Sequence, residues 1–428
     1  MNLPATLDGW LEYIERQHPQ SIAMGLERVA VVRDALALKP EFPLITVGGT
    51  NGKGSVCMML DAILGHARYN AGTYTSPHLL RYNERVRIAA REAEDDDLVR
   101  AFAAVEAARA ASGVALTYFE FGTLAALWLF REKKVDVAIL EVGLGGRLDA
   151  VNAFDADVAV LTGIGMDHTE YLGETREAIA FEKVQIFRQG RPGICSDASP
   201  PAVVTEEAAR IGAKFLQIGR DFGYDAQAQQ WNYRGPGGNR HGLPLPALRG
   251  EFQLANASAC ITALDALRER LPVTAADIRG GLVSVENPGR FQVLPGRPAV
   301  ILDVAHNPHA AAALALNLVR MTGYRRTLAV FSMLKDKDVS GVVRELRGHV
   351  DHWLVAPLEG PRAMTAEALA QLLRDAGIAA GAISVEENMS AALTEAYRRA
   401  GDGDRILAFG SFLTVTAVMH AVHARRNQ

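Results

Sequence analysis

The chain has 428 residues, enough for two or three domains of ordinary size. A hydrophobic fraction of 49% and a charged fraction of 22% are typical of a globular protein with real cores. The net charge of -4 argues against a nucleic-acid-binding protein, and no uncharged apolar run reaches the roughly 18 residues of a membrane helix.

The amino terminus and the cysteines favour a cytoplasmic protein. The first residues, MNLPATLDGWLEYIERQ, lack the basic flank and the apolar run of a signal peptide. The three cysteines are odd in number and form no CxxC pair, so neither a disulfide framework nor a zinc ribbon is expected. Buried core positions are the simplest interpretation of Cys57, Cys195 and Cys260. We therefore expect a protein that binds neither nucleic acid nor membrane.

Short apolar runs alternate with helical patterns over the first half of the chain. Pro43–Gly48, Val135–Glu141 and Asp157–Gly163 are typical of buried strands, because they are continuous and rich in Val, Ile and Leu. Helical patterns cover residues 53–68, 95–112, 120–133 and 176–187. This alternation predicts an α/β domain with a parallel sheet that is covered on both faces.

A change of composition marks the middle of the chain. Residues 222–246 are rich in Gly and Pro and predict short strands and loops at the edge of the first domain, before a helix over 252–270. Residues 286–298 carry three prolines and two glycines, as a hinge does. The strand-like segments AVILDVA, RRTLAVFS, HWLVAP and RILAFG follow. We expect domains at 1–287 and 288–428, the second a smaller Rossmann-like α/β domain.

The strongest local signal is the glycine-rich segment VGGTNGKGS, from Val47 to Ser55. It follows a predicted strand and opens a predicted helix, where backbone N–H groups and the helix N-terminus bind phosphate. Lys53 adds a full positive charge, and Ser55 or a neighbour is expected to cap the helix. The segment departs from GxxxxGK[ST], because Val47 replaces the first glycine and Gly54 replaces the usual hydroxyl residue. The alternative is a glycine-rich turn with a solvated lysine.

Polar residues at strand ends suggest a magnesium site. Glu141 ends a buried strand, where a carboxylate is costly unless it is paired or bound to a cation. Since no hydroxyl directly follows Lys53, Ser76 after the next strand is a candidate ligand, and His168 follows a further strand. Parallel strands bring their carboxyl ends to one edge. Taken singly, Ser76 is an ordinary turn residue and His168 a structural histidine; together with Glu141 they favour a metal site.

Several later residues have ordinary interpretations of their own. Lys183 in FEKVQIF is a helical lysine, which is usually solvated. Gln253 and Asn256 begin a helix, as a capping residue does. Arg290 in PGRF suits a hinge ion pair. The last group, Asp303, His306 and Asn307 in DVAHNPHA, suits a strand-end turn.

The chain as a whole resembles a known family. GTNGKGS resembles the folylpolyglutamate synthase branch of the Mur ligase superfamily, and further segments from SIAMGLERV to FGSF are similar to its bacterial bifunctional dihydrofolate synthase/folylpolyglutamate synthases. These segments are MGLERV, SPHLLRYNERVRI, LTYFEFGTLAALWLF, EVGLGGRLDA, DVAHNPHAA and APLEGPR. The resemblance implies a Mur-ligase-like ATP-binding domain followed by a smaller α/β domain that contributes to ATP and glutamate binding.

The resemblance also implies an activity. It implies an ATP-dependent ligase, a monomer, that adds L-glutamate to 7,8-dihydropteroate and to reduced folates. The carboxylate is activated as an acyl phosphate and the glutamate amine, held between the domains, attacks it. Mg²⁺ is the implied metal ion. Lys183 corresponds to a lysine that CO₂ carbamylates in the family, although Val184 and Gln185 replace the usual Ala-Gly.

The resemblance assigns roles residue by residue. Catalytic roles fall on Lys53, Lys183 and His168, and metal binding falls on Ser76, Glu141 and His168. ATP binding falls on Gly49, Thr50, Asn51, Gly52, Lys53, Gly54 and Ser55, on Asn256 at the adenine side, on Arg290 at the phosphates, and on Asp303 and His306. Pteroate binding falls on Ile22, Ala23, Met24, Gly25, Thr117, Tyr118, Phe119, Glu120, Leu148, Asp149 and Ala150. Lys335 belongs to a further active-site loop, and Ser411 is expected near glutamate.

The residues of the pteroate set suit their role chemically. Phe119 offers a face for an aromatic ring, and Asp149 suits a pterin amidine edge, although core packing is the ordinary interpretation of Phe119.

Three alternatives remain open on the sequence alone. A peptidoglycan-building Mur ligase usually carries a nucleotide-sugar domain before its phosphate loop, whereas only 47 residues precede Gly48. A nucleotide-hydrolysing switch needs no second domain arranged for a further substrate. A folylpolyglutamate synthase without dihydrofolate synthase activity shares most of the motifs, and LTYFEFGTL favours an enzyme with both activities.

Overall fold

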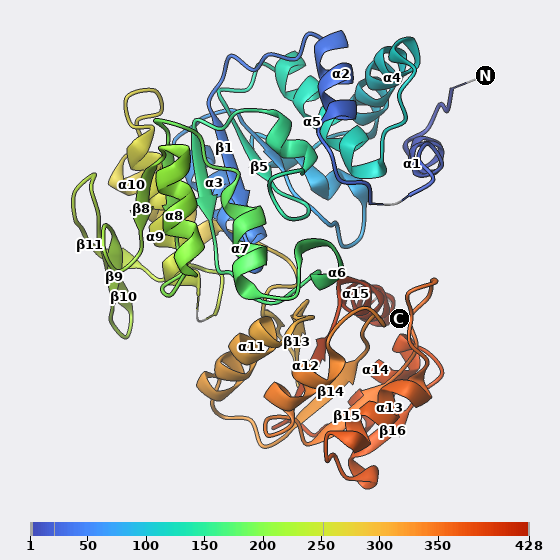
Figure 1. Cartoon of the computed structure of the whole chain (residues 1–428). Coiled ribbons are helices and arrows are strands. Elements are labelled where there is room, and N and C mark those ends of the chain that lie inside the picture. The colour runs from blue at the N-terminus through green and yellow to red at the C-terminus, as the bar shows by residue number, and fades with distance from the viewer. Residues whose placement is uncertain (1–2, 21, 251, 427–428) are drawn as a thin grey trace. The chain divides into compact units, whose positions relative to one another are not determined.

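The computed structural model describes residues 3–20, 22–250 and 252–426, and the chain forms two compact units (Figure 1). Unit 1 comprises the chain up to Ala247 and Leu254–Val285. Unit 2 comprises Leu248–Gln253 and the chain from Glu286 onward. Each unit contains a sheet of mostly parallel strands, which confirms the predicted α/β class.

The sheet of unit 1 has eight strands in the order β4-β3-β2-β5-β1-β6-β7-β8. Its parallel strands are β1 (Leu44–Gly48), β2 (Ala71–Tyr74), β5 (Val137–Glu141), β6 (Val158–Leu161), β7 (Pro192–Cys195) and β8 (Lys214–Gln217). The strands β3 (Val86–Ile88) and β4 (Arg91–Glu92) pair antiparallel at one edge, which the sequence did not predict. β1 lies between β5 and β6. The chain runs from β1 to β2 on one side and later crosses from β5 to β6 on the other, so the strand order reverses at β1, as at the ligand-binding switch points of α/β folds.

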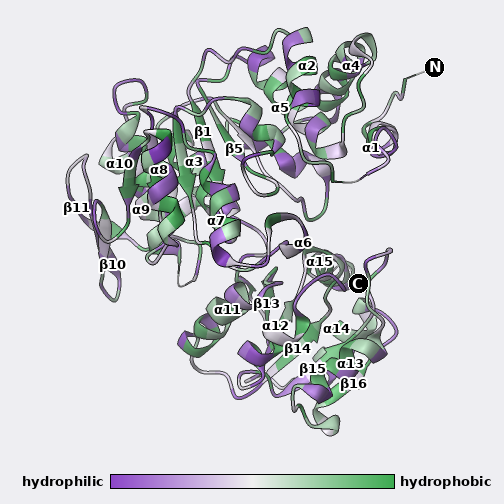
Figure 2. Cartoon of the chain, viewed as in Figure 1, coloured by the Kyte–Doolittle hydropathy of each residue, from purple (hydrophilic) through white to green (hydrophobic). Residues whose placement is uncertain are grey.

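Helices cover both faces of this sheet (Figure 1). They are α1 (Leu7–Glu15), α2 (Glu27–Ala35), α3 (Lys53–His66), α4 (Asp95–Ser112), α5 (Tyr118–Glu132), α6 (Thr169–Leu172), α7 (Arg176–Val184), α8 (Ala202–Ile211), α9 (Gln253–Ala266) and α10 (Ala275–Ser284). Ala138 and Leu140 of β5 join the core formed with α1, α2, α4 and α5, whereas α3 packs against β1, β2 and β5. The strands are accordingly hydrophobic and the polar residues lie on helices and loops (Figure 2).

The predicted element bounds hold to within a few residues. The helix expected over 95–112 is α4, and the strand expected at Val135–Glu141 begins two residues later, at Val137. The Gly- and Pro-rich segment 222–246 forms a separate antiparallel sheet of β9 (Gly223–Ala226), β10 (Gln230–Arg234) and β11 (Arg240–Pro244). It is anchored on α9 by Tyr233, whose hydroxyl lies 2.9 Å from Thr262 Oγ1.

Unit 2 has a six-stranded sheet in the order β12-β13-β17-β14-β15-β16, parallel except for β12. Its strands are β12 (Gln292–Leu294), β13 (Ala299–Asp303), β14 (Thr327–Phe331), β15 (His352–Val355), β16 (Ile383–Val385) and β17 (Arg405–Phe409). The helices are α11 (Pro308–Arg320), α12 (Val339–Leu346), α13 (Ala366–Asp375), α14 (Met389–Arg399) and α15 (Phe412–Arg426). The first three share one core with the sheet, while α14 and α15 pack on β14, β15 and β17.

Two sequence expectations bear on the whole chain. Cys57, Cys195 and Cys260 are all buried and unpaired, as predicted. Over residues 3–20, 22–250 and 252–426, no helix combines the length and the apolar character that crossing a membrane requires.

Candidate active site

The glycine-rich loop follows β1 and enters α3 in a conformation that only glycine adopts easily. Gly49 has φ 142°, and a Cβ at this position would lie 1.8 Å from Thr162 Oγ1. Gly52 has φ 98° and is the N-cap of α3, with no side-chain capping hydrogen bond. The loop therefore enters α3 through a left-handed glycine, and the first N–H groups of the helix follow directly after it.

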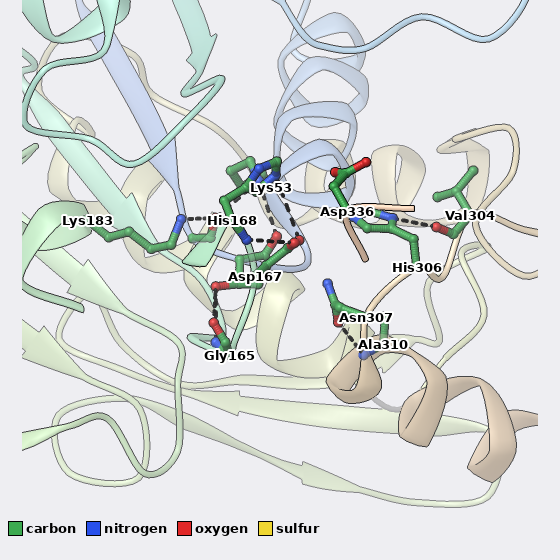
Figure 3. A network of polar contacts seen from close by, with 12 residues as sticks. Lys53, Gly165, Asp167, His168, Lys183, Val304, His306, Asn307, Ala310 and Asp336 are labelled. Atoms are coloured by element: carbon green, nitrogen blue, oxygen red, sulfur yellow. Dashed lines mark hydrogen bonds and ion pairs between the residues drawn. The ribbon is translucent and has the colours of Figure 1, made fainter. Parts of the chain in front are cut away.

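Hydrogen bonds fix this loop on the strand next to it. Thr50 donates its N–H to the Gly163 carbonyl at 2.8 Å, and its hydroxyl contacts the Gly165 carbonyl at 3.1 Å (Figure 3). Thr162 Oγ1 donates to the Gly48 carbonyl at 3.1 Å. The loop is thus held in place by the segment that follows β6.

Two lysines converge on one carbonyl of the loop. Lys53 Nζ donates to the Gly49 carbonyl at 3.1 Å and to the Thr50 carbonyl at 3.2 Å, and Lys183 Nζ donates to the same Gly49 oxygen at 3.0 Å (Figure 3). Lys183 is 5% exposed, so it is not the solvated helical lysine that its sequence context alone suggested. Burial, and then the charge of Lys53, lower the pKa of Lys183 to about 7.

The structure joins two of the three predicted metal ligands. Glu141 ends β5, is buried, and lies in register beside Val47 of β1. Its Oε2 accepts the N–H of Ser76 at 3.0 Å, so a carboxylate and a hydroxyl residue meet beside the phosphate loop. Hard oxygen donors of this kind suit Mg²⁺. Within the described part of the chain, no group of three or more His, Cys, Asp or Glu side chains forms a metal site by itself.

The third predicted ligand, His168, lies at the start of α6. Its backbone has φ 51°, and its Nε2 lies 3.9 Å from Asp167 Oδ2 (Figure 3). Asp167 also accepts the His168 N–H at 2.9 Å, which fixes the turn that presents the imidazole. The loop with Asp167 and His168 follows β6, the strand next to β1, and so shares the carboxyl edge of the sheet with Glu141.

Asn256 reaches the phosphate loop from α9. A Cβ on Gly52 would lie 3.0 Å from Asn256 Oδ1, so the amide is packed directly against the loop. Asn256 is buried in the fourth position of α9, and Gln253 is the first residue of that helix. The predicted association of Asn256 with a nucleotide is therefore geometrically possible within unit 1.

The three segments assigned to pteroate lie together. Arg28 donates to Glu120 Oε1 and to the Ala23 carbonyl, both at 2.7 Å, which joins the segment 22–25 to the start of α5. The N–H of Gly25 contacts the Leu148 carbonyl at 3.4 Å, which joins the same segment to residues 148–150. Distant parts of the sequence thus form one surface, and Glu120 holds it together.

Phe119 and Asp149 have defined places in this surface. The Phe119 ring lies 5.8 Å from the ring of Tyr74, and it closely approaches Gly143, where a Cβ would be 2.6 Å away. Asp149 is buried and accepts the N–H groups of Leu144 and Val151 at 2.8 Å and 3.0 Å. Burial raises the pKa of Asp149 to about 6 despite these donors. Its carboxyl group therefore shapes the loop after Glu141.

In unit 2, the predicted residues lie at the carboxyl ends of adjacent strands. Asp303 ends β13 and accepts the N–H groups of Phe291 and Ala305, each at 2.8 Å. Burial raises the pKa of Asp303. His306 Nδ1 lies 2.8 Å from the Val304 carbonyl, which requires a proton on Nδ1 (Figure 3). Arg290 lies over the Phe412 ring, 5.0 Å from its centroid.

The remaining predicted residues of unit 2 follow β13, β14 and β17. Ser411 is buried, and its hydroxyl bonds Thr414 Oγ1 at 2.8 Å at the start of α15. Lys335 Nζ donates to the Pro361 carbonyl at 2.8 Å. Asn307 caps α11, with Oδ1 accepting the Ala310 N–H at 2.9 Å (Figure 3). Because β13, β17 and β14 are neighbours, these residues share one edge of the sheet.

Sequence reasoning missed the residues that position the site. Arg28 stood in the quoted motif MGLERV but was assigned no role. Arg147 pairs with Glu182 at 3.0 Å and so ties the loop after Glu141 to α7, the helix that carries Lys183. The only sequence signal for these ion pairs was charge next to assigned residues, which does not reveal the partner.

Comparison with known proteins agrees with this geometry. The model of the Mur ligase middle domain matches residues 47–264, and that of the Mur ligase glutamate ligase domain matches residues 289–412. A dihydrofolate synthase/folylpolyglutamate synthase of Escherichia coli (strain K12) is 44% identical over 98% of this chain and 96% of its own length.

Solved structures are equally similar. E. coli FolC in complex with DHPP and ADP is 43% identical, with a TM-score of 0.94 and 100% of each chain covered. A bifunctional folylpolyglutamate synthase/dihydrofolate synthase with Mn, AMPPNP and L-glutamate bound is 41% identical, with a TM-score of 0.90 and 99% and 100% of the two chains covered.

The chain belongs to the Mur ligase family of ATP-dependent ligases. Within that family, it belongs with the bifunctional dihydrofolate synthase/folylpolyglutamate synthases of folate biosynthesis. The predicted family and class of enzyme are thereby confirmed.

Proposed function

We propose that this enzyme joins L-glutamate to the carboxylate of 7,8-dihydropteroate and to the terminal glutamate of reduced folates, and that Mg²⁺·ATP is its nucleotide substrate. The convergence of Lys53, Lys183 and the buried Glu141 on the glycine-rich loop carries this proposal. The complexes of its relatives with DHPP, ADP, AMPPNP, Mn and L-glutamate support it.

Phosphoryl transfer comes first in the proposed mechanism. The loop amides and Lys53 hold the γ-phosphate, and an oxygen of the pteroate or folate carboxylate attacks its phosphorus. The bond from phosphorus to the bridging oxygen breaks, ADP leaves, and an acyl phosphate forms. Lys53 neutralises charge on the transferred group, and positioning supplies most of the acceleration.

Amide formation follows. The neutral amine of L-glutamate attacks the acyl carbon, the bond to the phosphate oxygen breaks, and the amine loses one proton. The products are the amide and inorganic phosphate. We assign Arg290, Asp303 and His306 to nucleotide binding, and Lys335 and Ser411 to the glutamate side of the reaction, on the basis of their shared sheet edge in unit 2.

The metal assignment rests on donor chemistry. Ser76 and Glu141 place a hydroxyl and a buried carboxylate side by side, and His168 follows the neighbouring strand. A divalent cation held there supplies charge neutralisation for the β- and γ-phosphates. The residues present therefore fit Mg²⁺, with the oxygen donors as its principal ligands.

Lys183 has the chemistry that carbamylation requires. A pKa of about 7 leaves a large neutral fraction at physiological pH, and only the neutral amine attacks CO₂. The neutral amine forms a new N–C bond to CO₂ and loses one proton, which gives a carbamate anion; starting from the ammonium form, two protons are released in all. We propose that this carbamate lies beside the phosphate loop, where Lys53 compensates its charge.

The pteroate surface joins residues 22–25, 117–120 and 148–150. We propose that Phe119 stacks on the aromatic part of the substrate and that Asp149 receives the amidine edge of the pterin. The raised pKa of Asp149 indicates a desolvated carboxyl group, which gains most from a charge-assisted pair with a ligand.

ADP release tests the proposal directly. The purified enzyme is supplied with ATP, Mg²⁺ and L-glutamate, first alone, then with dihydropteroate, then with tetrahydrofolate. We expect release that requires glutamate together with either pteridine. Lys53→Ala and Glu141→Ala should abolish it, and exposed Lys214→Ala should not.

Each other outcome has a defined meaning. Response to tetrahydrofolate alone would indicate a folylpolyglutamate synthase without dihydrofolate synthase activity. ADP release without glutamate would contradict the ligase mechanism and favour a nucleotide switch. Unchanged turnover in Lys53→Ala would contradict its assigned role.

A further inference from the structure

A cavity lined mostly by charged side chains lies in unit 2, at the opposite edge of the sheet from Asp303 and Ser411. Its volume is about 330 Å³, and it is lined by Arg326, Leu328, Asp351, His352, Arg398 and Arg399. We call it the arginine cavity. Arg326 and His352 stand at the amino-terminal ends of β14 and β15, whereas the residues assigned to the reaction follow the carboxyl ends of the strands.

Acidic neighbours pair with the three arginines of this cavity, but these pairs do not use all of the guanidinium N–H donors. Glu395 pairs with Arg398 and Arg399, and Asp404 pairs with Arg326 at 2.7 Å. In the described chain, these bonds leave Nη1 of Arg326, Nη1 of Arg398 and Nη2 of Arg399 without a hydrogen-bond acceptor. Three guanidinium groups therefore retain donors around one cavity.

His352 Nε2 lies near two hydrogen-bond partners, and the protonation state of the ring determines which of them it bonds. Its Nε2 is 2.6 Å from Arg399 Nη1 and 2.9 Å from Ser384 Oγ. A guanidinium only donates, so Arg399 bonds Nε2 only when that nitrogen is unprotonated. Once Nε2 carries a proton, it donates to Ser384 Oγ, and Arg399 Nη1 loses its acceptor. Protonation of His352 thus adds a charge to the cavity and releases a guanidinium donor.

The charged surroundings oppose this protonation. Burial and the charges of Arg399 and Arg326 lower the pKa of His352, and Glu395 on α14 counteracts them. Further charged groups on the neighbouring elements are Asp351 before β15, Glu386 after β16, Arg398 on α14, Asp404 before β17 and Arg405, the first residue of β17. An anion within the cavity would reverse the balance, because it attracts both the arginines and the imidazolium.

We propose that the arginine cavity binds a small multivalent oxyanion, a phosphate or a polycarboxylate, and that binding is coupled to protonation of His352. Guanidinium groups bind both kinds of oxyanion through paired N–H donors. The cavity lies at the amino-terminal edge of the sheet, so its ligand does not take the place of a nucleotide at the carboxyl edge.

The test follows His352 itself in the full-length protein. Histidine-labelled protein is titrated with pH by NMR, and the His352 signal is identified by its loss in His352→Gln. The titration is repeated with millimolar inorganic phosphate, and separately with a γ-linked triglutamate peptide as the polycarboxylate. The Arg398→Gln variant separates phosphate bound in the arginine cavity from phosphate held by the glycine-rich loop of unit 1.

We expect one of the two anions to raise the apparent pKa of His352 by about one unit, which corresponds to roughly tenfold tighter binding to the protonated form. The anion that produces the shift identifies the ligand class. Arg398→Gln should remove the shift, and Arg374→Gln on the exposed face of α13 should retain it. The Arg398 side chain is 69% exposed, so its replacement is not expected to prevent folding; equal melting temperatures of the two variants check this.

Two results would overturn the proposal. One is a His352 titration that neither anion changes in the unsubstituted protein. The other is a shift that persists fully in Arg398→Gln, since the anion would then bind elsewhere.

Discussion

Replacing Lys183 with methionine removes a buried amine while keeping most of the side-chain volume. Lys183 is 5% exposed, and burial is the largest cause that lowers the pKa of its amine to about 7. Lysine in an unfolded chain titrates near 10.4, and a difference of about three units is worth roughly 4 kcal/mol. The hydrogen bond to the Gly49 carbonyl, about 1 kcal/mol, offsets part of this cost.

The sign of the effect follows from proton binding. Between about pH 7 and pH 10, the unfolded chain holds a proton on Lys183 that the folded chain has lost. The free energy of unfolding of the unsubstituted protein therefore rises with pH in this window, by up to about 1.4 kcal/mol per unit. Lys183→Met lacks this contribution. We expect it to be more stable by roughly 3 kcal/mol at pH 7, with the difference disappearing toward pH 10.

Thermal unfolding measures the difference. Melting temperatures are recorded from pH 7 to pH 10 in CO₂-free buffer. For a unit of this size, a change of about 1 kcal/mol in the free energy of unfolding shifts the melting temperature by roughly 2 °C. Lys214→Met, at an exposed position of β8, is the matched control and should show no such trend. A stability difference that does not change with pH would refute the desolvation argument. Adding bicarbonate should stabilise the unsubstituted protein and not Lys183→Met, if the carbamate forms.

Three further substitutions test other parts of the site. Arg28→Ala should raise KM for dihydropteroate about tenfold and leave KM for ATP unchanged, because a charged hydrogen bond to Glu120 is worth about 1.5–3 kcal/mol. Steady-state kinetics measure both values. A large change in both KM values would contradict the positioning role of Arg28. Gly49→Ala should abolish ATP binding in calorimetry, since the new Cβ would lie 1.8 Å from Thr162 Oγ1. Thr117→Ala removes the N-cap of α5 and should cost about 1 kcal/mol, seen as a melting temperature lower by roughly 2 °C.

The sequence by itself determined the features whose causes are local. The loop from Val47 to Ser55 was recognisable because strand, glycines, lysine and helix follow one another directly. Glu141 was recognisable as a strand-end carboxylate because a polar residue interrupts an apolar run. The restart of the α/β pattern after residue 298 was likewise visible in composition, and the extended family resemblance added the activity.

Only the tertiary structure decided which of these residues meet. Lys183 is 134 positions from Gly49, and its burial depends on how α7 packs beside the loop, which a helical sequence pattern does not reveal. Arg28 joins residues 22–25 to α5 through Glu120, and the arginine cavity gathers side chains from β14, β15 and α14. Periodicity specifies which face of an element is apolar, whereas charge pairing and desolvation arise only after distant elements have packed.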